Sequence, residues 1–216
     1  MAAKRQPAMN VAKWRTPSDL WIDHAHISTD DLKHLEAVEK LTLWNVTYTE
    51  ELFACMPNLW WLDIRGGSAS NFHSLPTAND LRYLQINQIR GLRDLNDITS
   101  LEKLELLSLY GLSKVFEIPD LTKLSHLKRI EIGQMKALKD LVSVWRADQL
   151  EEILLIKDVP VETRDIVSIN RMPNLSAFRW YAMDVPARRF MPIRTGVTIP
   201  EASAMHAADW FKHQSA

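Results

Sequence analysis

Two histidines near the N-terminus have the type and spacing that could bind a metal ion. His24 and His26 lie two positions apart, and three aspartates are close in the sequence, Asp23, Asp30 and Asp31. Imidazole nitrogens are common zinc ligands, but a zinc site also needs a third or fourth protein ligand at a defined position. The other histidines are scattered and supply no such ligand. We therefore interpret His24 and His26 as part of a polar turn and predict no metal site.

The single cysteine and the six glycines give no sign of an active site. A nucleophilic thiol needs a lowered pKa and a partnered base, and nothing near Cys55 indicates either, so we expect Cys55 to pack in the core. With one cysteine the chain can form no intrachain disulfide. The glycines match neither a G-x-G-x-x-G motif nor a P-loop, and Gly66-Gly67 predicts a turn with positive φ. The sequence thus predicts no enzyme and no cofactor.

Composition narrows the possible partners and the compartment. The chain has 216 residues, of which 46% are hydrophobic and 25% charged, and its formal net charge is −1. This charge gives no electrostatic reason to expect nucleic acid or an anionic membrane as partner. No apolar run follows the charged N-terminus, and none reaches the roughly 20 residues that a spanning helix needs. We expect a cytoplasmic protein, in keeping with the lone cysteine.

One short pattern recurs along most of the chain. In residues 127–135 (LKRIEIGQM) the first, fourth, sixth and ninth positions are apolar. Since side chains alternate along a strand, Ile130 and Ile132 point to one face, and Arg129, Glu131 and Gly133 point to the other. The intervals between successive copies are 21, 21, 22, 23, 23, 23 and 25 residues. The copies start at Pro17, Val38, Leu59, Leu81, Leu104, Leu127, Leu150 and Leu175.

The pattern L-x-x-L-x-L at this period resembles the leucine-rich repeat family. Residues 59–64 (LWWLDI) and 81–86 (LRYLQI) are the clearest copies. The ninth position departs from the family's usual Asn or Cys, since it holds Ala25, Val46, Gly67, Ile89, Leu112, Met135, Asp158 and Met183. The resemblance implies an α/β solenoid with a parallel β-sheet on the concave face and helices or loops on the convex face.

Both ends of a stack of repeats expose core and need a cover. We divide the chain into an N-terminal arm (1–16), about eight repeats (17–183) and a C-terminal cap (184–216). The arm offers only Val11 and Trp14 to a core, so we expect little of it to be ordered. Prolines argue against a long helix in 185–193, whereas 200–212 should form one. Its apolar stripe should close the last repeat through Ala204, Met205, Ala208 and Phe211.

Two return segments carry the signature of a capped helix. Ser28 with Asp31 and Thr47 with Glu50 have the spacing of a capping box, and apolar residues at helical spacing follow each pair. We therefore predict helical turns after Ser28 and after Thr47.

Aromatic side chains gather on one predicted surface. The third, fifth and seventh residues of each repeat should point out of the concave sheet. They include Trp21, Trp44, Trp61, Tyr83 and Tyr110, interspersed with Asp23, Asp63 and Arg65. An exposed apolar patch usually marks an interaction site, and Trp, Tyr and Arg are the residues enriched in interface hot spots. The alternative is that residues from either end of the chain fold over these aromatics.

These features favour a non-enzymatic binding module that grips a protein on its concave face. Proteins of the leucine-rich repeat family act mainly through protein–protein contacts. Such a module would be a monomer when free, and would block or neutralise its partner, as an immunity protein masks a toxin. The alternative is self-assembly into a homo-oligomer through the same face. A metal protein or enzyme based on His24 and His26 is the least favoured hypothesis.

Overall fold

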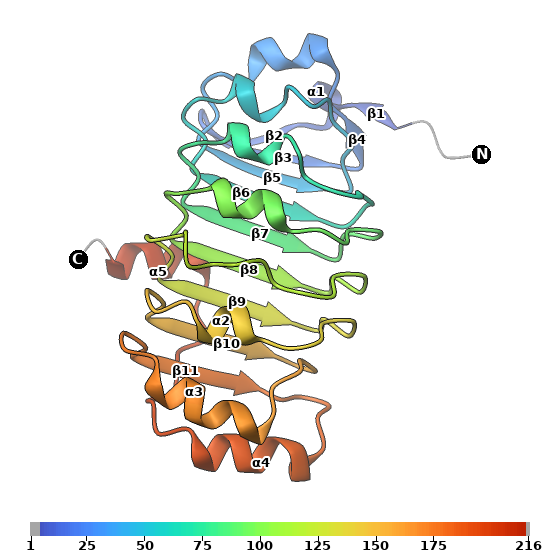
Figure 1. The fold of residues 1–216 in the computed structure, drawn as a ribbon. Helices are drawn as coiled ribbons and strands as arrows, with labels where there is room; N and C mark the ends of the chain where they lie inside the picture. Colours follow the sequence, from blue (N-terminus) through green and yellow to red (C-terminus); the bar gives the residue numbers. More distant parts are fainter. Residues whose placement is uncertain (1–4, 215–216) are drawn as a thin grey trace.

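The molecule is a stack of short strands joined by long return segments. A computed structural model describes residues 5–214. Within this range nine strands form one sheet in the order β11-β10-β9-β8-β7-β6-β5-β3-β2 (Figure 1). The strands of the repeats are parallel, and they are β3 (Asp19–Asp23), β5 (Lys40–Trp44), β6 (Trp61–Arg65), β7 (Tyr83–Asn87), β8 (Leu106–Tyr110), β9 (Arg129–Gly133), β10 (Glu152–Ile156) and β11 (Ala177–Tyr181).

The core lies on one side of this sheet, where the predicted register places it. Each strand begins two residues after the start of its repeat, and neighbouring strands pair in step, so that Leu41 lies beside Leu62 and Leu62 beside Leu84. The fourth and sixth residues of the eight repeats are all buried, none more than 5% exposed. Because one repeat cannot bury these side chains alone, the layers stabilise one another.

A residue in the left-handed backbone conformation directly follows most of the strands. Seven of the eight residues at the eighth position have φ between 50° and 68°: His24, Asn45, Gly66, Gln88, Gly111, Gln134 and Lys157. Their backbone N–H groups donate to the carbonyl that ends the next strand, as in His24 N to Trp44 O at 2.8 Å. The predicted positive φ at Gly66 and Gly67 is confirmed. The ladder of backbone bonds turns the chain out of the sheet, and apolar ninth residues such as Ile89 and Leu112 point into the core.

Short helices and loops form the other side of the solenoid (Figure 1). The predicted capping box at Ser28 is present, since its N–H and Oγ both donate to Asp31 Oδ2, at 2.8 and 2.7 Å. The predicted capping box at Thr47 is wrong, because Thr47 Oγ1 lies 2.9 Å from His26 Nδ1, and the helical turn that follows is limited to the three residues of η2. The elements are η1 (Thr29–His34), η2 (Phe53–Cys55), η3 (Leu75–Thr77), η4 (Asn96–Ser100), α2 (Val142–Trp145), η5 (Thr163–Asp165) and α3 (Ile166–Arg171).

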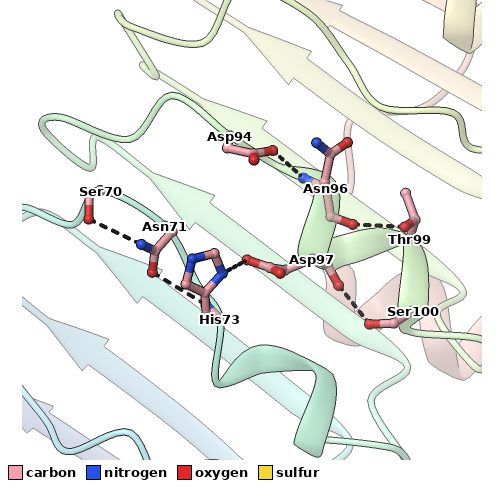
Figure 2. A network of polar contacts seen from close by, with 8 residues as sticks. All are labelled: Ser70, Asn71, His73, Asp94, Asn96, Asp97, Thr99 and Ser100. Carbon is pink, nitrogen blue, oxygen red and sulfur yellow. Dashed lines mark hydrogen bonds and ion pairs between the residues drawn. The ribbon is translucent and has the colours of Figure 1, made fainter.

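Polar contacts join successive return segments. Figure 2 shows His73, which leads into η3, with its Nδ1 3.0 Å from Asp97 Oδ2 in η4. Asp97 O in turn accepts the Ser100 hydroxyl at 2.7 Å, and Asp94 Oδ1 accepts the Asn96 N–H at 2.8 Å. These exposed bonds fix the turns locally, whereas the apolar layers beneath them supply most of the stability.

The N-terminal arm is more ordered than predicted. Its described part contains β1 (Gln6–Pro7), α1 (Ala8–Val11) and β2 (Lys13–Thr16); β1 pairs with β4 (Ala25–His26), and β2 runs antiparallel to β3. Residues 1–4 of the arm lie outside the described range. Ala8 is fully buried, but Trp14 is 44% exposed, so its predicted place in the core is wrong. A small side chain and strand pairing, which sequence hydrophobicity does not reveal, order this segment.

The C-terminal segment holds two helices, one more than predicted, and the predicted helix begins later and packs elsewhere than expected. The proline-containing stretch forms α4 (Ala187–Gly196), with Pro192 inside it. Packing offsets the hydrogen bond that Pro192 loses, since Ile193 is buried and the Phe190 ring lies 5.8 Å from Trp180 in the last repeat. The last helix, α5 (Ala207–Gln214), lies not over the last repeat but beside β8, several strands back (Figure 1).

Candidate protein-interaction face

The sheet face that points away from the core, here called the non-core face, carries the predicted aromatic residues. Trp44 is 41% exposed, and Trp21, Trp61 and Tyr110 are partly exposed. Tyr83 and Asp63 are only 4% exposed. The expectation that all of these side chains lie on an open surface is therefore wrong for Tyr83 and Asp63. The chain's own C-terminal helix covers Tyr83, and Asp63 is held in an ion pair with Arg65.

We call residues 200–214 the C-terminal strap. Its helix α5 places Trp210, 1% exposed, and Phe211 against Tyr83 and Leu106 on the non-core face. The Phe211 ring lies 6.4 Å from Tyr83, 6.1 Å from Trp61 and 5.5 Å from Trp60, measured between centroids. These rings form a second, smaller core on the opposite side of the sheet from the main one.

Buried Arg129 fixes the strap to the sheet. Its guanidinium has no exposed surface and donates to Glu131 Oε1 at 3.0 Å, to Glu152 Oε2 at 2.7 Å and to the Ser203 carbonyl at 3.2 Å. Trp210 Nε1 donates to the other oxygen of Glu152, at 3.0 Å. A buried charge must be paired and hydrogen-bonded, and the strap completes that pairing.

Sequence reasoning missed Arg129 and Trp210. Arg129 occupies the third position of its repeat, which strand alternation assigns to the solvent side, and Phe211 was assigned to the last repeat. The sequence did contain a signal for this contact, namely the adjacent aromatic residues Trp210 and Phe211 in the last helix. Two large neighbouring rings are expected to be buried against another surface of the protein. The pattern of one helix does not say which distant surface provides that site.

Trp210→Ala should loosen the strap while the repeats stay folded. The substitution removes the ring that binds Glu152 and packs on Leu106, and a terminal helix can detach without unfolding the rest. We expect amide exchange in 207–214 to speed up by about tenfold or more, as read by mass spectrometry. The exposed His213→Ala in the same helix is the control and should leave exchange unchanged. Equal exchange in both variants would contradict the anchoring role.

The part of the non-core face nearest the N-terminus stays open. Trp21 and Trp44 stack there with centroids 6.2 Å apart and planes at 23°, and the Arg15 guanidinium lies 4.3 Å from the centre of the Trp21 ring. We define the tryptophan patch as Trp21 and Trp44 with Asp23 and Arg65 beside them. Asp23, Trp44 and Arg65 lie side by side on three neighbouring strands, so that one charged residue stands on each side of Trp44.

A buried carboxylate holds Arg65 in place. Asp63 accepts from Arg65 Nε at 2.8 Å and from Nη2 at 2.6 Å, a two-pronged ion pair. Burial raises the pKa of the Asp63 carboxyl, and the hydrogen bonds and charge of Arg65 oppose that rise. Burial also raises the pKa of the Tyr83 hydroxyl, and the charges of Asp63 and Glu131 add to the effect. Asp63 thus fixes the position of Arg65 in the patch.

Tyr110 lies flat over the neighbouring strand. A Cβ atom on Gly133, directly beside it, would come within 2.6 Å of the Tyr110 ring, so only glycine leaves room there. The Tyr110 hydroxyl donates to Gln134 Oε1 at 2.6 Å. The predicted site residues therefore fall into an open group around Trp21 and Trp44 and a group beside the strap.

A solved structure has a similar fold. An internalin C2 from Listeria monocytogenes is 22% identical over 59% of this chain and 56% of its own, with a TM-score of 0.50. Internalins are leucine-rich repeat proteins. This chain has the fold of a leucine-rich repeat solenoid. An internalin F from the same organism matches with a TM-score of 0.46 at 16% identity, over 83% of this chain and 58% of its own.

The solenoid thus spans a little under three fifths of the length of both internalin structures. No protein-family model matches its sequence, and no curated protein sequence does. The predicted α/β fold and the resemblance to leucine-rich repeats are confirmed. Within residues 5–214, every helix of the solenoid falls short of the length and apolar character needed to cross a bilayer.

The histidines of the first repeat take separate partners in the solenoid. His24 Nδ1 lies 2.5 Å from Asp23 Oδ1, and His26 Nδ1 lies 2.9 Å from Thr47 Oγ1. Among residues 5–214 there is no group of three or more His, Cys, Asp or Glu side chains that could hold a metal ion. Cys55 is partly exposed, so the expectation that it packs fully in the core is wrong.

Proposed function

We propose that this solenoid is a non-enzymatic binding module that captures a protein partner on the tryptophan patch of its concave face. The exposure of Trp44, stacked on Trp21 and flanked by Asp23 and Arg65, supports the proposal most directly. A cluster of this kind offers a large apolar area with charged groups at its rim, the composition of interface hot spots. Tyr110 extends the surface toward the strap.

The proposed action is to block the partner by binding alone, as an immunity protein masks a toxin. The binding module would be a monomer when free and would act in the cytoplasm, where its single cysteine suits a reducing environment. Trp61, Tyr83 and Asp63 belong to this proposal as less open neighbours of the patch: Phe211 of the strap packs on the rings of Trp61 and Tyr83, and Asp63 holds Arg65.

Trp44→Ala is the direct test. Truncating a hot-spot aromatic typically costs about 2 kcal/mol, or roughly 30-fold in affinity. We expect this loss in the Kd for the partner recovered by pull-down from the source cell, measured by calorimetry. The thermal midpoint should hardly change, because Trp44 is exposed and lies outside both cores.

Trp14→Ala provides a matched control. Trp14 is as exposed as Trp44 but pairs directly with Leu20, and directly paired residues point to the same side of a sheet, here the core side. Its truncation should leave affinity unchanged. Equal affinity of the Trp44→Ala and wild-type proteins for the partner would refute the proposal. A wild-type dimer in light scattering that Trp44→Ala dissociates would assign the patch to self-assembly instead.

A further inference from the structure

A groove runs along the non-core face beside the strap. Its first compartment, about 430 Å³, lies between strands β6–β10 and strap residues Met205–Ala208. A second compartment, about 580 Å³, continues over β10 and β11 to Met183. The two share Glu131, Ile156, Met205 and His206, so they are continuous. Six strands spaced by about 4.8 Å make the groove roughly 24 Å long, the reach of about seven extended residues.

The floor of the first compartment offers unused hydrogen-bonding groups. Gln85 and Ser108 are neighbours in the fifth-position row, and Asn87 lies in the seventh-position row. Within residues 5–214 the side chains of Asn87 and Ser108 have no hydrogen-bond partner. The Gln85 carbonyl accepts the Tyr83 hydroxyl at 2.7 Å, which leaves its NH₂ group available. Amide and hydroxyl groups in a row match the alternating N–H and C=O groups of an extended backbone.

The middle of the groove carries excess negative charge. Glu131 and Glu152 share the single guanidinium of Arg129, which leaves one negative charge uncompensated by that cation. Arg129 is fully buried and pairs with both Glu131 and Glu152, so its positive charge is already outweighed by these carboxylates and does not favour an anion in the groove. Asp209 on the strap side is exposed and paired with Lys212 at 3.0 Å, so the excess charge rests on the two glutamates. A cationic group fits here better than a neutral or an anionic one.

The far end of the groove is apolar. Leu154 and Ile156 of β10 form its floor, and Tyr181 and the exposed Met183 lie beyond them. In an extended peptide, side chains two positions apart point the same way and lie about 6.7 Å from each other. If one peptide side chain lies over Glu131 of β9, the peptide side chain two positions away therefore reaches the surface around Leu154 and Ile156 of the neighbouring strand β10.

We propose that this groove binds an extended peptide segment of the partner, with a Lys or Arg over Glu131 and a large apolar residue two positions away over Leu154 and Ile156. The inference rests on the proposed function and names the partner's chemistry. Strap residues Met205–Ala208 form one wall of the site, so the chain's C-terminus completes the groove that the repeats alone leave open.

Selection of random heptapeptides displayed on phage, with the full-length chain as bait, tests the groove. We expect enriched peptides that pair a basic residue with a large apolar residue two positions away. Ala208→Trp and Ala204→Trp add bulk to the two compartments from the exposed strap side and should weaken a selected peptide by about tenfold or more. His213→Trp, an exposed site on α5 that does not line the groove, is the matched control and should change affinity less than about twofold.

The charge is tested with Glu131→Gln and with the selected peptide in which the basic residue is replaced by Gln. Each change alone should weaken binding, and the two together should add little further loss, because both remove the same interaction. Additive losses of affinity in this cycle would overturn the inference. So would a selection that enriches no peptide family, or undiminished affinity of the Ala208→Trp and Ala204→Trp proteins for the selected peptide. If peptides fail while Trp44→Ala still weakens capture of the whole partner, the proposed function stands and only the groove assignment falls.

Discussion

Arg129→Ala should lower the free energy of unfolding by about 3 kcal/mol. The substitution removes the guanidinium that Glu131 and Glu152 share and the donor that binds the Ser203 carbonyl. Removing one member of a buried ion pair leaves an uncompensated charge, which typically costs about 3–5 kcal/mol. We expect the lower end, because the side chains of Glu131 and Glu152 are still 19% and 20% exposed. Urea unfolding followed by circular dichroism measures the change.

Arg82→Ala is the control for this prediction. Arg82 also pairs with a glutamate of the next repeat, Glu105, but its side chain is 44% exposed. An exposed pair contributes at most about 1 kcal/mol, so this variant should unfold close to the wild type. A loss for Arg129→Ala no larger than that for Arg82→Ala would contradict the structural role of the buried guanidinium.

Ile132→Ala and Leu107→Ala should each lower the free energy of unfolding by about 2–5 kcal/mol. Both side chains are buried in the main core, where the layers of adjacent repeats stack, so truncation leaves a cavity between neighbours that depend on each other. The same urea unfolding experiment measures the loss.

Lys128→Ala should change stability by less than about 0.5 kcal/mol. Lys128 lies four residues before Ile132, and its exposed side chain forms only a long ion pair, 3.4 Å from Glu151. Comparable losses in the Lys128→Ala and Ile132→Ala proteins would contradict the burial of Ile132 in the main core.

The strand register and the repeat were predictable from sequence because they depend on local geometry. Side chains of a strand alternate by covalent geometry, so the spacing of Ile130 and Ile132 within one repeat already identifies the core face. Because all eight repeats have the same apolar positions, they bury these side chains together only when neighbouring strands pair in the same register. The turns were partly predictable: Gly66 indicates positive φ, but His24 and Lys157 adopt it too, because the backbone ladder to the next strand stabilises an otherwise unfavourable conformation.

The candidate site was predictable only in its open half. Strand alternation placed Trp21 and Trp44 on the non-core face, and they are partly exposed there. The same rule placed Tyr83 and Arg129 in solvent, yet tertiary contacts bury both. Arg129 binds the Ser203 carbonyl 74 residues away, and Glu152 binds Trp210 58 residues away. Where the strap docks depends on competition among all apolar surfaces of the folded molecule, and no periodicity within one segment encodes that outcome.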